Sequence, residues 1–362
     1  MSFKPTRREW VKMSAMAAAA VAFAGGGHDA VGQNGAGLIK LSGNENPYGP
    51  PPKARKALAD ALTGANRYVP PETLAQLESM IAEREGVKPE SVVAATGSGE
   101  ILCMAAVAFG KKEIVAPTPT FPTLMRYAEL LGATVRNVPL TAAFEHDLAA
   151  MRRAVSENTS IVFTCNPNNP TGGLTPNDEL RSFVREASTR VPVFSDEAYL
   201  EYTDDFPRNS MIDLVRAGEN VIVSRTFSKV YGMAGLRVGY GIAKPELAAR
   251  LRRYRMTWLN NTSIAAAITA YADQAFVAES KKRNEEVRGW FLKELDTIGV
   301  RYAPTVSNFA WVNIGAGVQN YTDGMREKGF LIGRADNGWT RVTIGTADEM
   351  RKYVAALKQI RS

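Results

Sequence analysis

Short apolar runs alternate with longer helical stretches through the first two thirds of the chain. Six apolar runs predict strands: residues 91–95, 113–116, 134–139, 161–165, 191–195 and 221–224. Helical patterns between them include residues 100–109 and the amphipathic stretch 177–188. Strands that alternate with helices predict an α/β fold with an open, mostly parallel sheet.

The pattern changes after Leu259. Two helical stretches, residues 264–278 and 281–298, are followed by strand-like runs at 309–314 and 340–344. This order predicts a second, smaller α+β domain. The chain shows no internal repeat.

The N-terminus resembles a twin-arginine export signal. Arg7 and Arg8 lie within a matching motif at residues 6–12, and the Ala-rich run 11–24 ends in the small-residue cleavage pattern Ala22-Phe23-Ala24. This run is too short to span a bilayer permanently. We therefore expect residues 1–24 to be a signal peptide read by the twin-arginine translocation machinery, which places the protein in the periplasm or otherwise outside the cytoplasm. The alternatives are an exposed Ala-rich helix or a start codon placed too early.

Residues 25–37 separate this signal from the folded part. Six of these thirteen residues are Gly, which is typical of a flexible tether. Twin-arginine export carries folded proteins, often ones that acquire a cofactor before export. The tether and signal together therefore make a cofactor worth seeking in the rest of the chain.

Composition narrows the class of protein. The 362 residues are 45% hydrophobic and 22% charged, with a mean hydropathy of −0.18, as in ordinary globular proteins of about two domains. The formal charge of +7 falls to +4 once residues 1–24 are removed, and this weak surplus does not indicate nucleic-acid binding. The densest basic run is expected to be a solvated face of a helix that begins near Pro245; its members are Arg250, Arg252, Arg253 and Arg255.

Cysteine and histidine are scarce. Cys103 and Cys165 can form at most one disulfide, and neither has a partner at metal-ligand spacing. The only histidines are His28 and His146, which excludes a histidine-rich zinc site and makes any Ser/His/Asp triad depend on His146. No metal is expected, so the chemistry must use other groups.

Polar residues follow the predicted strands, at the edge where open α/β sheets bind ligands. Gly97, Ser98 and Gly99 can present backbone amides to an anion at a helix N-terminus. Ser228-Lys229 places a hydroxyl beside an amine that can form a Schiff base, and Asp196 follows a buried strand, where a carboxylate needs a cationic partner. Each feature also has an ordinary alternative, namely a βα loop, a solvated lysine and a helix N-cap.

Taken together and in order, these segments resemble the fold type I pyridoxal 5'-phosphate (PLP) aminotransferases, most closely the histidinol-phosphate aminotransferase family. The resemblance runs from about Leu38 to the C-terminus. The segments that carry it are NENPYG at 44–49, RY at 67–68, NPTG at 169–172, DEAY at 196–199, SK at 228–229, AGLR at 234–237 and RVTIG at 341–345. It implies a large PLP-binding domain (residues 68–259) with a seven-stranded, mostly parallel sheet. A small domain would comprise the arm 38–67 and residues 260–362.

The resemblance assigns catalytic roles. Lys229 would hold PLP as a Schiff base and then move the proton between the substrate's α-carbon and the cofactor. Asp196 would pair with the pyridine nitrogen and keep it protonated. Asn169 and Tyr199 would hydrogen-bond the cofactor's phenolic oxygen, and Phe121 would stack on the ring, where many relatives carry Tyr.

It also assigns the phosphate site. The residues expected to hold the phosphate are Ser98 and Gly99 through their backbone, Thr226 and Ser228 through their hydroxyls, and Arg237. Tyr68 would reach the phosphate from the neighbouring subunit, which implies a homodimer with shared active sites. Many relatives have Asp in place of Gly99, so this chain departs from the family there.

The resemblance also implies a substrate-binding site. Arg341 would clamp the substrate carboxylate, with Tyr48 and Asn46 beside it. The implied reaction is a ping-pong transfer of an amino group between an α-amino acid, or a histidinol-phosphate-like amine, and a 2-oxo acid. Because histidine synthesis is cytoplasmic, an exported enzyme is not expected to serve it. The alternatives are oxidation, decarboxylation or elimination on the same cofactor, or a ligand-binding protein without turnover.

Overall fold

The computed structural model describes residues 37–333 and 335–361. The predicted export signal and nearly all of the predicted tether lie outside these residues. None of the described helices combines the length and apolar character needed to cross a membrane.

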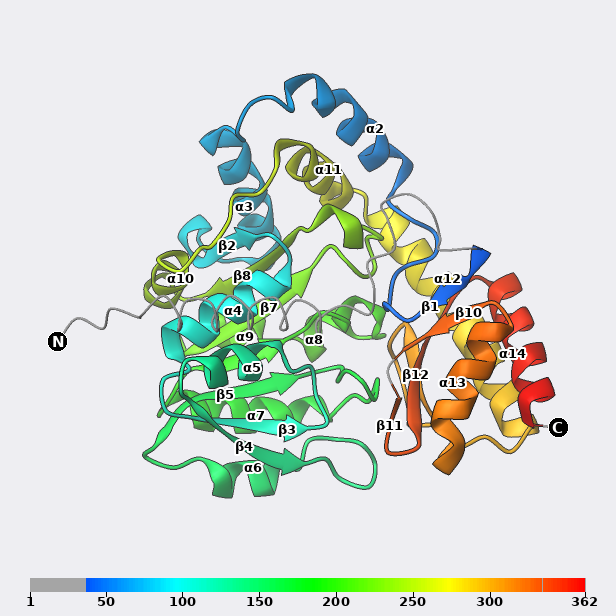
Figure 1. Cartoon of the computed structure of the whole chain (residues 1–362). Coiled ribbons are helices and arrows are strands. Elements are labelled where there is room, and N and C mark those ends of the chain that lie inside the picture. The colour runs from blue at the N-terminus through cyan, green and yellow to red at the C-terminus, as the bar shows by residue number, and fades with distance from the viewer. Residues whose placement is uncertain (1–36, 334, 362) are drawn as a thin grey trace, which may run out of the picture.

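A seven-stranded sheet forms the centre of the larger part of the molecule (Figure 1). Its strands are β2 (Val92–Ala95), β3 (Glu113–Thr118), β4 (Thr134–Pro139), β5 (Thr159–Cys165), β6 (Val193–Asp196), β7 (Val221–Thr226) and β8 (Gly239–Ala243). Their spatial order is β2-β8-β7-β6-β5-β3-β4, and all neighbours are parallel except β8, which runs antiparallel to β2 and β7. The prediction of a seven-stranded, mostly parallel sheet is confirmed.

Both faces of this sheet are covered by helices. Side chains alternate between the two faces of a strand, and each face of this sheet has its own buried apolar cluster. Val92 packs into one of these clusters, and its neighbour Val93 packs into the other. The covering helices are α3 (Pro71–Glu85), α4 (Ser98–Phe109), α5 (Thr123–Leu130), α6 (Leu148–Ala154), α7 (Asn177–Ser188), α9 (Ile212–Arg216) and α10 (Pro245–Arg252). The short α8 (Phe206–Asn209) packs on the turn Leu200–Tyr202 that follows β6.

Strand β8 was not predicted, because its Gly-Tyr-Gly-Ile-Ala sequence lacks the run of branched residues that marks the other strands. The glycines have a steric reason. A Cβ on Gly239 would lie 2.2 Å from the Ser98 amide nitrogen, and one on Gly241 would lie 2.9 Å from Ile101. Glycine therefore lets α4 begin directly against the sheet.

The smaller part has its own sheet and helices, to the right of the large sheet in Figure 1. Strands β11 (Ala335–Asp336), β12 (Trp339–Thr343) and β9 (Phe309–Asn313) form an antiparallel sheet, and β1 (Ile39–Leu41) of the N-terminal arm pairs in parallel with β10 (Phe330–Ile332). Its helices are α12 (Gln274–Thr297), α13 (Val318–Glu327) and α14 (Ala347–Arg361). The rest of the arm forms α2 (Pro52–Ala61), which packs on α11 (Asn261–Ala272) above the large sheet.

One local prediction was wrong and another holds only in part. The break between the helices after Leu259 lies at Asp273 rather than near residue 280, because the Asp273 carboxylate caps α12 by accepting a hydrogen bond from the Phe276 amide (3.3 Å). The basic run is a solvated face only in part: Arg250 and Arg253 are exposed, whereas Arg252 and Arg255 are half-buried. Arg252 donates to the backbone carbonyls of Glu90 and Val92, and Arg255 donates to that of Ala94. These arginines satisfy the open edge of β2, the outermost strand.

Candidate active site

Lys229 follows β7 and lies half-buried between the two parts of the molecule. Its Nζ donates a hydrogen bond to the Gly43 carbonyl (3.1 Å) and lies 5.4 Å from the centre of the Tyr199 ring. Burial lowers the pKa of Lys229 from 10.5 to about 7, with a further contribution from the nearby Arg341 cation. A substantial share of this amine is therefore neutral, and hence nucleophilic, near neutral pH.

Asp196 ends β6 with its side chain buried. Its carboxylate accepts a hydrogen bond from the Ala198 amide (3.3 Å), and no ion pair joins it to any side chain in the described part of the chain. Burial raises the pKa of Asp196 from 3.8 to about 7, and the neighbouring Glu197 adds to the rise. A buried carboxylate in this state requires a cationic partner that a ligand can supply, as the protonated pyridine nitrogen of PLP does.

The Tyr199 hydroxyl lies at the junction of three segments. It accepts a hydrogen bond from Asn44 Nδ2 (3.0 Å) and one from Asn169 Nδ2 (3.3 Å), which leaves its own hydrogen to donate elsewhere. Burial raises the pKa of Tyr199, so the hydroxyl stays protonated. Asn44 was not singled out from the sequence, although it belongs to the NENPYG segment that carried the resemblance.

Arg341 points from β12 toward the same residues. Its Nη1 donates to Asn169 Oδ1 (2.7 Å) and its Nη2 donates to the Ser42 carbonyl (2.7 Å). Its buried Nε has no hydrogen-bond partner among the described residues. An unpaired buried donor on a guanidinium held by two other bonds is suited to receive an anion such as a carboxylate.

A second anion site lies where α4 begins. Gly97 precedes the helix with φ 86°, and a Cβ there would lie 2.4 Å from Arg237 Nη2, so only glycine lets this guanidinium lie against the turn. Arg237 also approaches the Ser228 hydroxyl (3.4 Å), and Thr226 Oγ1 accepts from the Ser228 amide (3.1 Å). Free helix amides, an arginine and two hydroxyls in one place match the needs of a phosphate group.

The remaining predicted residues differ in exposure. Tyr68 lies between α2 and α3 and is 90% exposed. Asn46 is buried and donates to the Val230 carbonyl (2.8 Å), so its amide ties the arm to the chain next to Lys229. Tyr48 lies under the Arg283 guanidinium (4.8 Å), and Phe121 is half-buried after β3. The roles of these four side chains in binding stay predictions.

Gly99 is the position where this chain departs from the family. A Cβ built on it would meet no atom within 4 Å. The missing side chain therefore leaves open space beside the turn, and the backbone of the turn does not require glycine there.

These side chains fit PLP at both ends. Asp196, a buried carboxylate without a cation, would hold the ring nitrogen. Lys229, whose pKa is lowered by burial, would supply the amine, and the turn at the start of α4 would hold the phosphate. No group of side chains in the described residues has the composition of a metal site.

Comparisons with known proteins agree with this reading. The family model for aminotransferase class I and II matches residues 36–357. The histidinol-phosphate aminotransferase of Moorella thermoacetica is 38% identical over 331 residues, which are 89% of this chain and 85% of that protein. The enzyme of the same name from Akkermansia muciniphila is 36% identical, over 91% of this chain and 92% of its own length.

Solved structures of aminotransferases also match this chain. The histidinol-phosphate aminotransferase of Sinorhizobium meliloti, solved in complex with pyridoxal-5'-phosphate, superposes with a TM-score of 0.82 at 26% identity, and the match covers 89% of this chain and 90% of that one. The aspartate aminotransferase of Thermotoga maritima has a TM-score of 0.80 at 22% identity, with 96% of each chain covered, and shares the fold.

Proposed function

The chain belongs to the class I and II aminotransferase family, and from this premise we propose an exported homodimer that moves amino groups between an α-amino acid and a 2-oxo acid. The enzyme is a PLP-dependent aminotransferase. The observation that carries its chemistry is the convergence of three side chains: Lys229 after β7, Asp196 at the end of β6 and Arg341 in β12. The charges of Arg341 and Asp196 both act on the Lys229 amine.

When bound, PLP supplies a ring that accepts the electron pair released at the substrate's α-carbon. The chain's own residues do the rest. Lys229 Nζ would take the proton from the substrate's α-carbon and deliver it to the cofactor, because a pKa of about 7 lets one amine act as base and as acid near neutral pH. Asp196 would hold the ring nitrogen of PLP and keep it protonated. Arg341 orients the substrate by its carboxylate, and the burial of Asp196 and Tyr199 excludes water.

The structure bears more directly on the amino acceptor, a 2-oxo acid, than on the amino donor. In a ping-pong reaction both substrates use one site, so a 2-oxo acid must place its carboxylate where Arg341 Nε is unpaired, whatever the donor is. To identify the donor, the purified holoenzyme is titrated with a panel of amino acids and with histidinol phosphate while its visible spectrum is recorded. We expect at least one α-amino acid to convert the band of the bound cofactor to that of its aminated form. A cofactor band that no amine changes would contradict transamination, and carbon dioxide, ammonia or peroxide as a product would favour the alternative outcomes.

Histidinol phosphate is the second candidate donor, because the relatives above carry that name. The predicted export argues against a role in histidine synthesis, since such an enzyme meets its substrates outside the cytoplasm. To test a role in histidine synthesis, the full-length gene is expressed in a histidine-requiring strain that lacks histidinol-phosphate aminotransferase. We expect no rescue, and growth without histidine would favour histidinol phosphate.

The proposed export rests on Arg7-Arg8 and the segment that follows, which lie outside the described residues. Replacing both arginines with lysine keeps the charge and removes only the feature that the translocation machinery recognises. We expect the variant to remain in the cytoplasm as a folded, yellow, active enzyme while the wild type accumulates outside. A wild type that fractionates wholly with the cytoplasm and keeps its N-terminus would overturn this proposal.

The proposed dimer is supported by large apolar side chains on the surface. Tyr68 is 90% exposed and Trp258 is 71% exposed, with Leu62 and Met256 also exposed. To test for shared sites, inactive Lys229→Ala chains are mixed with chains weakened at Tyr68. Heterodimers regain one intact site if the two residues come from different chains. Absence of recovery, once subunit exchange has been demonstrated, would count against a shared site.

A further inference from the structure

The carboxylate of Glu100 joins two segments that are far apart in the sequence. Glu100 lies in the first turn of α4 and is 8% exposed. Its Oε2 accepts hydrogen bonds from the amide (2.7 Å) and the hydroxyl (2.6 Å) of Thr96. Its Oε1 accepts from the amides of Met256 (2.9 Å) and Thr257 (3.0 Å). One oxygen therefore holds the turn at 96–99, and the other holds the segment 256–258.

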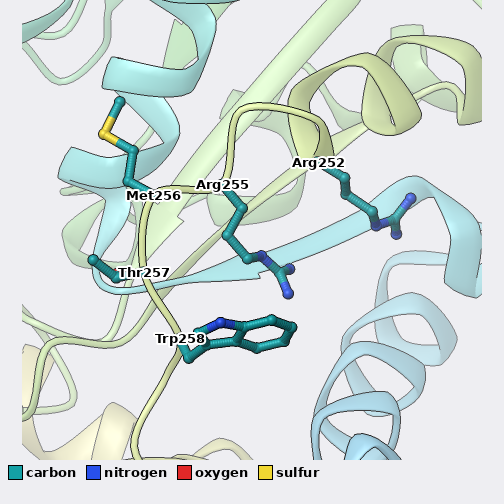
Figure 2. Close-up of a pocket in the computed structure, with 5 residues that line it drawn as sticks. All are labelled: Arg252, Arg255, Met256, Thr257 and Trp258. Atoms are coloured by element: carbon teal, nitrogen blue, oxygen red, sulfur yellow. The ribbon is translucent and has the colours of Figure 1, made fainter.

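The two segments also touch each other directly. The hydroxyls of Thr96 and Thr257 lie 2.8 Å apart, and Arg255 anchors the start of the second segment by donating to the Ala94 carbonyl (2.9 Å). Figure 2 shows Thr257 beside the chain that leads from β2 into α4, with Met256 and Trp258 on either side of it. The side chains of Met256 and Trp258 are exposed. Glu100 therefore links the proposed phosphate turn to a surface segment.

Only a carboxylate satisfies this arrangement. Both oxygens of Glu100 act as acceptors, and each receives at least one backbone amide. A glutamine has one acceptor oxygen, so its NH₂ group would face an amide donor that it cannot accept from. Burial acts to raise the pKa of Glu100, but the hydrogen bonds from Thr96, Thr257 and Met256 outweigh it and lower the pKa. The group is therefore an ionised acceptor at neutral pH.

The charge itself cannot favour a phosphate. Glu100 is an anion at the same helix N-terminus, so by Coulomb's law it repels a second anion there. Any gain in phosphate affinity must come from the geometry that the carboxylate fixes. The Thr96 amide and hydroxyl that it holds lie just before Ser98 and Gly99, the residues whose backbone is assigned to the anion site.

We propose that Glu100 is a positioning residue that holds the turn 96–99 in the conformation that binds the cofactor's phosphate and ties it to the segment 256–258. This inference rests on the assignment of that turn as the phosphate site. It predicts a selective effect, because pyridoxal has the ring and the aldehyde of PLP but lacks the phosphate. Loss of the Glu100 carboxylate should weaken PLP and leave pyridoxal unchanged.

The experiment compares the wild type with Glu100→Gln and with Glu90→Gln, which makes the same charge change at an exposed site near the same edge of the sheet. Dissociation constants for PLP and for pyridoxal are measured on the apoenzymes, and kcat is measured at saturating PLP. We expect Glu100→Gln to weaken PLP about tenfold or more, as the loss of acceptors for buried amides implies. We expect pyridoxal affinity and kcat to change by less than about twofold, the size of a small surface effect. Glu90→Gln should match the wild type.

A second variant tests the same inference if Glu100→Gln does not fold. Thr257→Val removes the hydroxyl contact to Thr96 at an exposed position and keeps the backbone amide. It should weaken PLP selectively, though less than Glu100→Gln. PLP affinity unchanged in these variants, or PLP and pyridoxal weakened by the same factor, would overturn the inference. A wild type that prefers PLP to pyridoxal but converts no amine would count against the proposed substrates and not against Glu100.

Discussion

Replacing Asp196 with Asn should stabilise the apoenzyme while it destroys activity. Asparagine has nearly the same shape as aspartate and can still accept the hydrogen bond that the Ala198 amide donates (3.3 Å). The substitution therefore removes the buried charge and little else. In the holoenzyme the same substitution takes away the acceptor for the protonated ring nitrogen, so we expect weaker PLP binding and a large fall in kcat.

The magnitude follows from the pKa. Burial raises the pKa of Asp196 from 3.8 to about 7, so the folded state binds the proton more tightly than the unfolded chain does. The stability contributed by this carboxyl is fully present below about pH 4 and is lost as the pH rises toward 7. At about 1.4 kcal/mol per pH unit, the folded state above pH 7 carries a cost of about 4 kcal/mol that Asn does not carry. Glu201 and Lys229, whose pKa values are also about 7, titrate in both proteins and largely cancel in the comparison.

The assay is urea unfolding of both apoenzymes at pH 5 and pH 8. The stability of Asp196→Asn relative to the wild type should be greater at pH 8 than at pH 5 by about 3 kcal/mol. Asp60→Asn serves as the control, because the Asp60 carboxylate is 63% exposed on α2 and should produce a much smaller pH-dependent difference. An Asp196→Asn apoenzyme that is less stable than the wild type at pH 8, or a difference that does not grow with pH, would refute the reasoning.

Three other substitutions test single roles. Lys229→Ala should abolish turnover in a steady-state assay, because no other amine takes its position, and a wild-type rate would refute the assignment. Arg341→Ala should cost about 2–5 kcal/mol in kcat/KM for carboxylate-bearing donors, and an unchanged ratio would place the carboxylate elsewhere. Arg225→Met leaves the buried carboxylates of Glu85 and Glu197, now 2.7 and 3.1 Å from the guanidinium, without their cation. It should lower the free energy of unfolding by about 3–5 kcal/mol in urea titration, whereas a loss below about 1 kcal/mol would show that the cluster relaxes.

The sequence predicted the sheet well because most of its strands are apolar runs, although β4 is mixed and largely exposed. Each of the six predicted runs overlaps an observed strand, from β2 to β7. The strand ends then placed Asp196 and Lys229 at one edge, as parallel topology requires. Strand β8 was not predicted because its glycines allow α4 to pack closely against it. That need arises only in the folded protein, and it leaves no apolar run in the sequence.

Contacts between distant segments could not be predicted either, because they too form only in the folded protein. Asn44 meets Tyr199 across 155 positions, and Glu100 meets Thr257 across 157. Neither contact has a local signal, because each forms only when the N-terminal arm or the segment after α10 folds onto the large sheet. Half of the basic run was misread for the same reason, since the carbonyls that Arg252 and Arg255 bind belong to an edge strand more than a hundred residues away.

The central claim is that Lys229 carries PLP and releases it to an amino substrate. The most direct measurement is borohydride reduction of the purified holoenzyme, followed by peptide mapping by mass spectrometry. The account predicts a pyridoxyl group on the peptide that contains Lys229, and its loss when an effective amino donor is added before reduction without a 2-oxo acid. A pyridoxyl group on a different lysine, or a label that no amino donor removes, would contradict it.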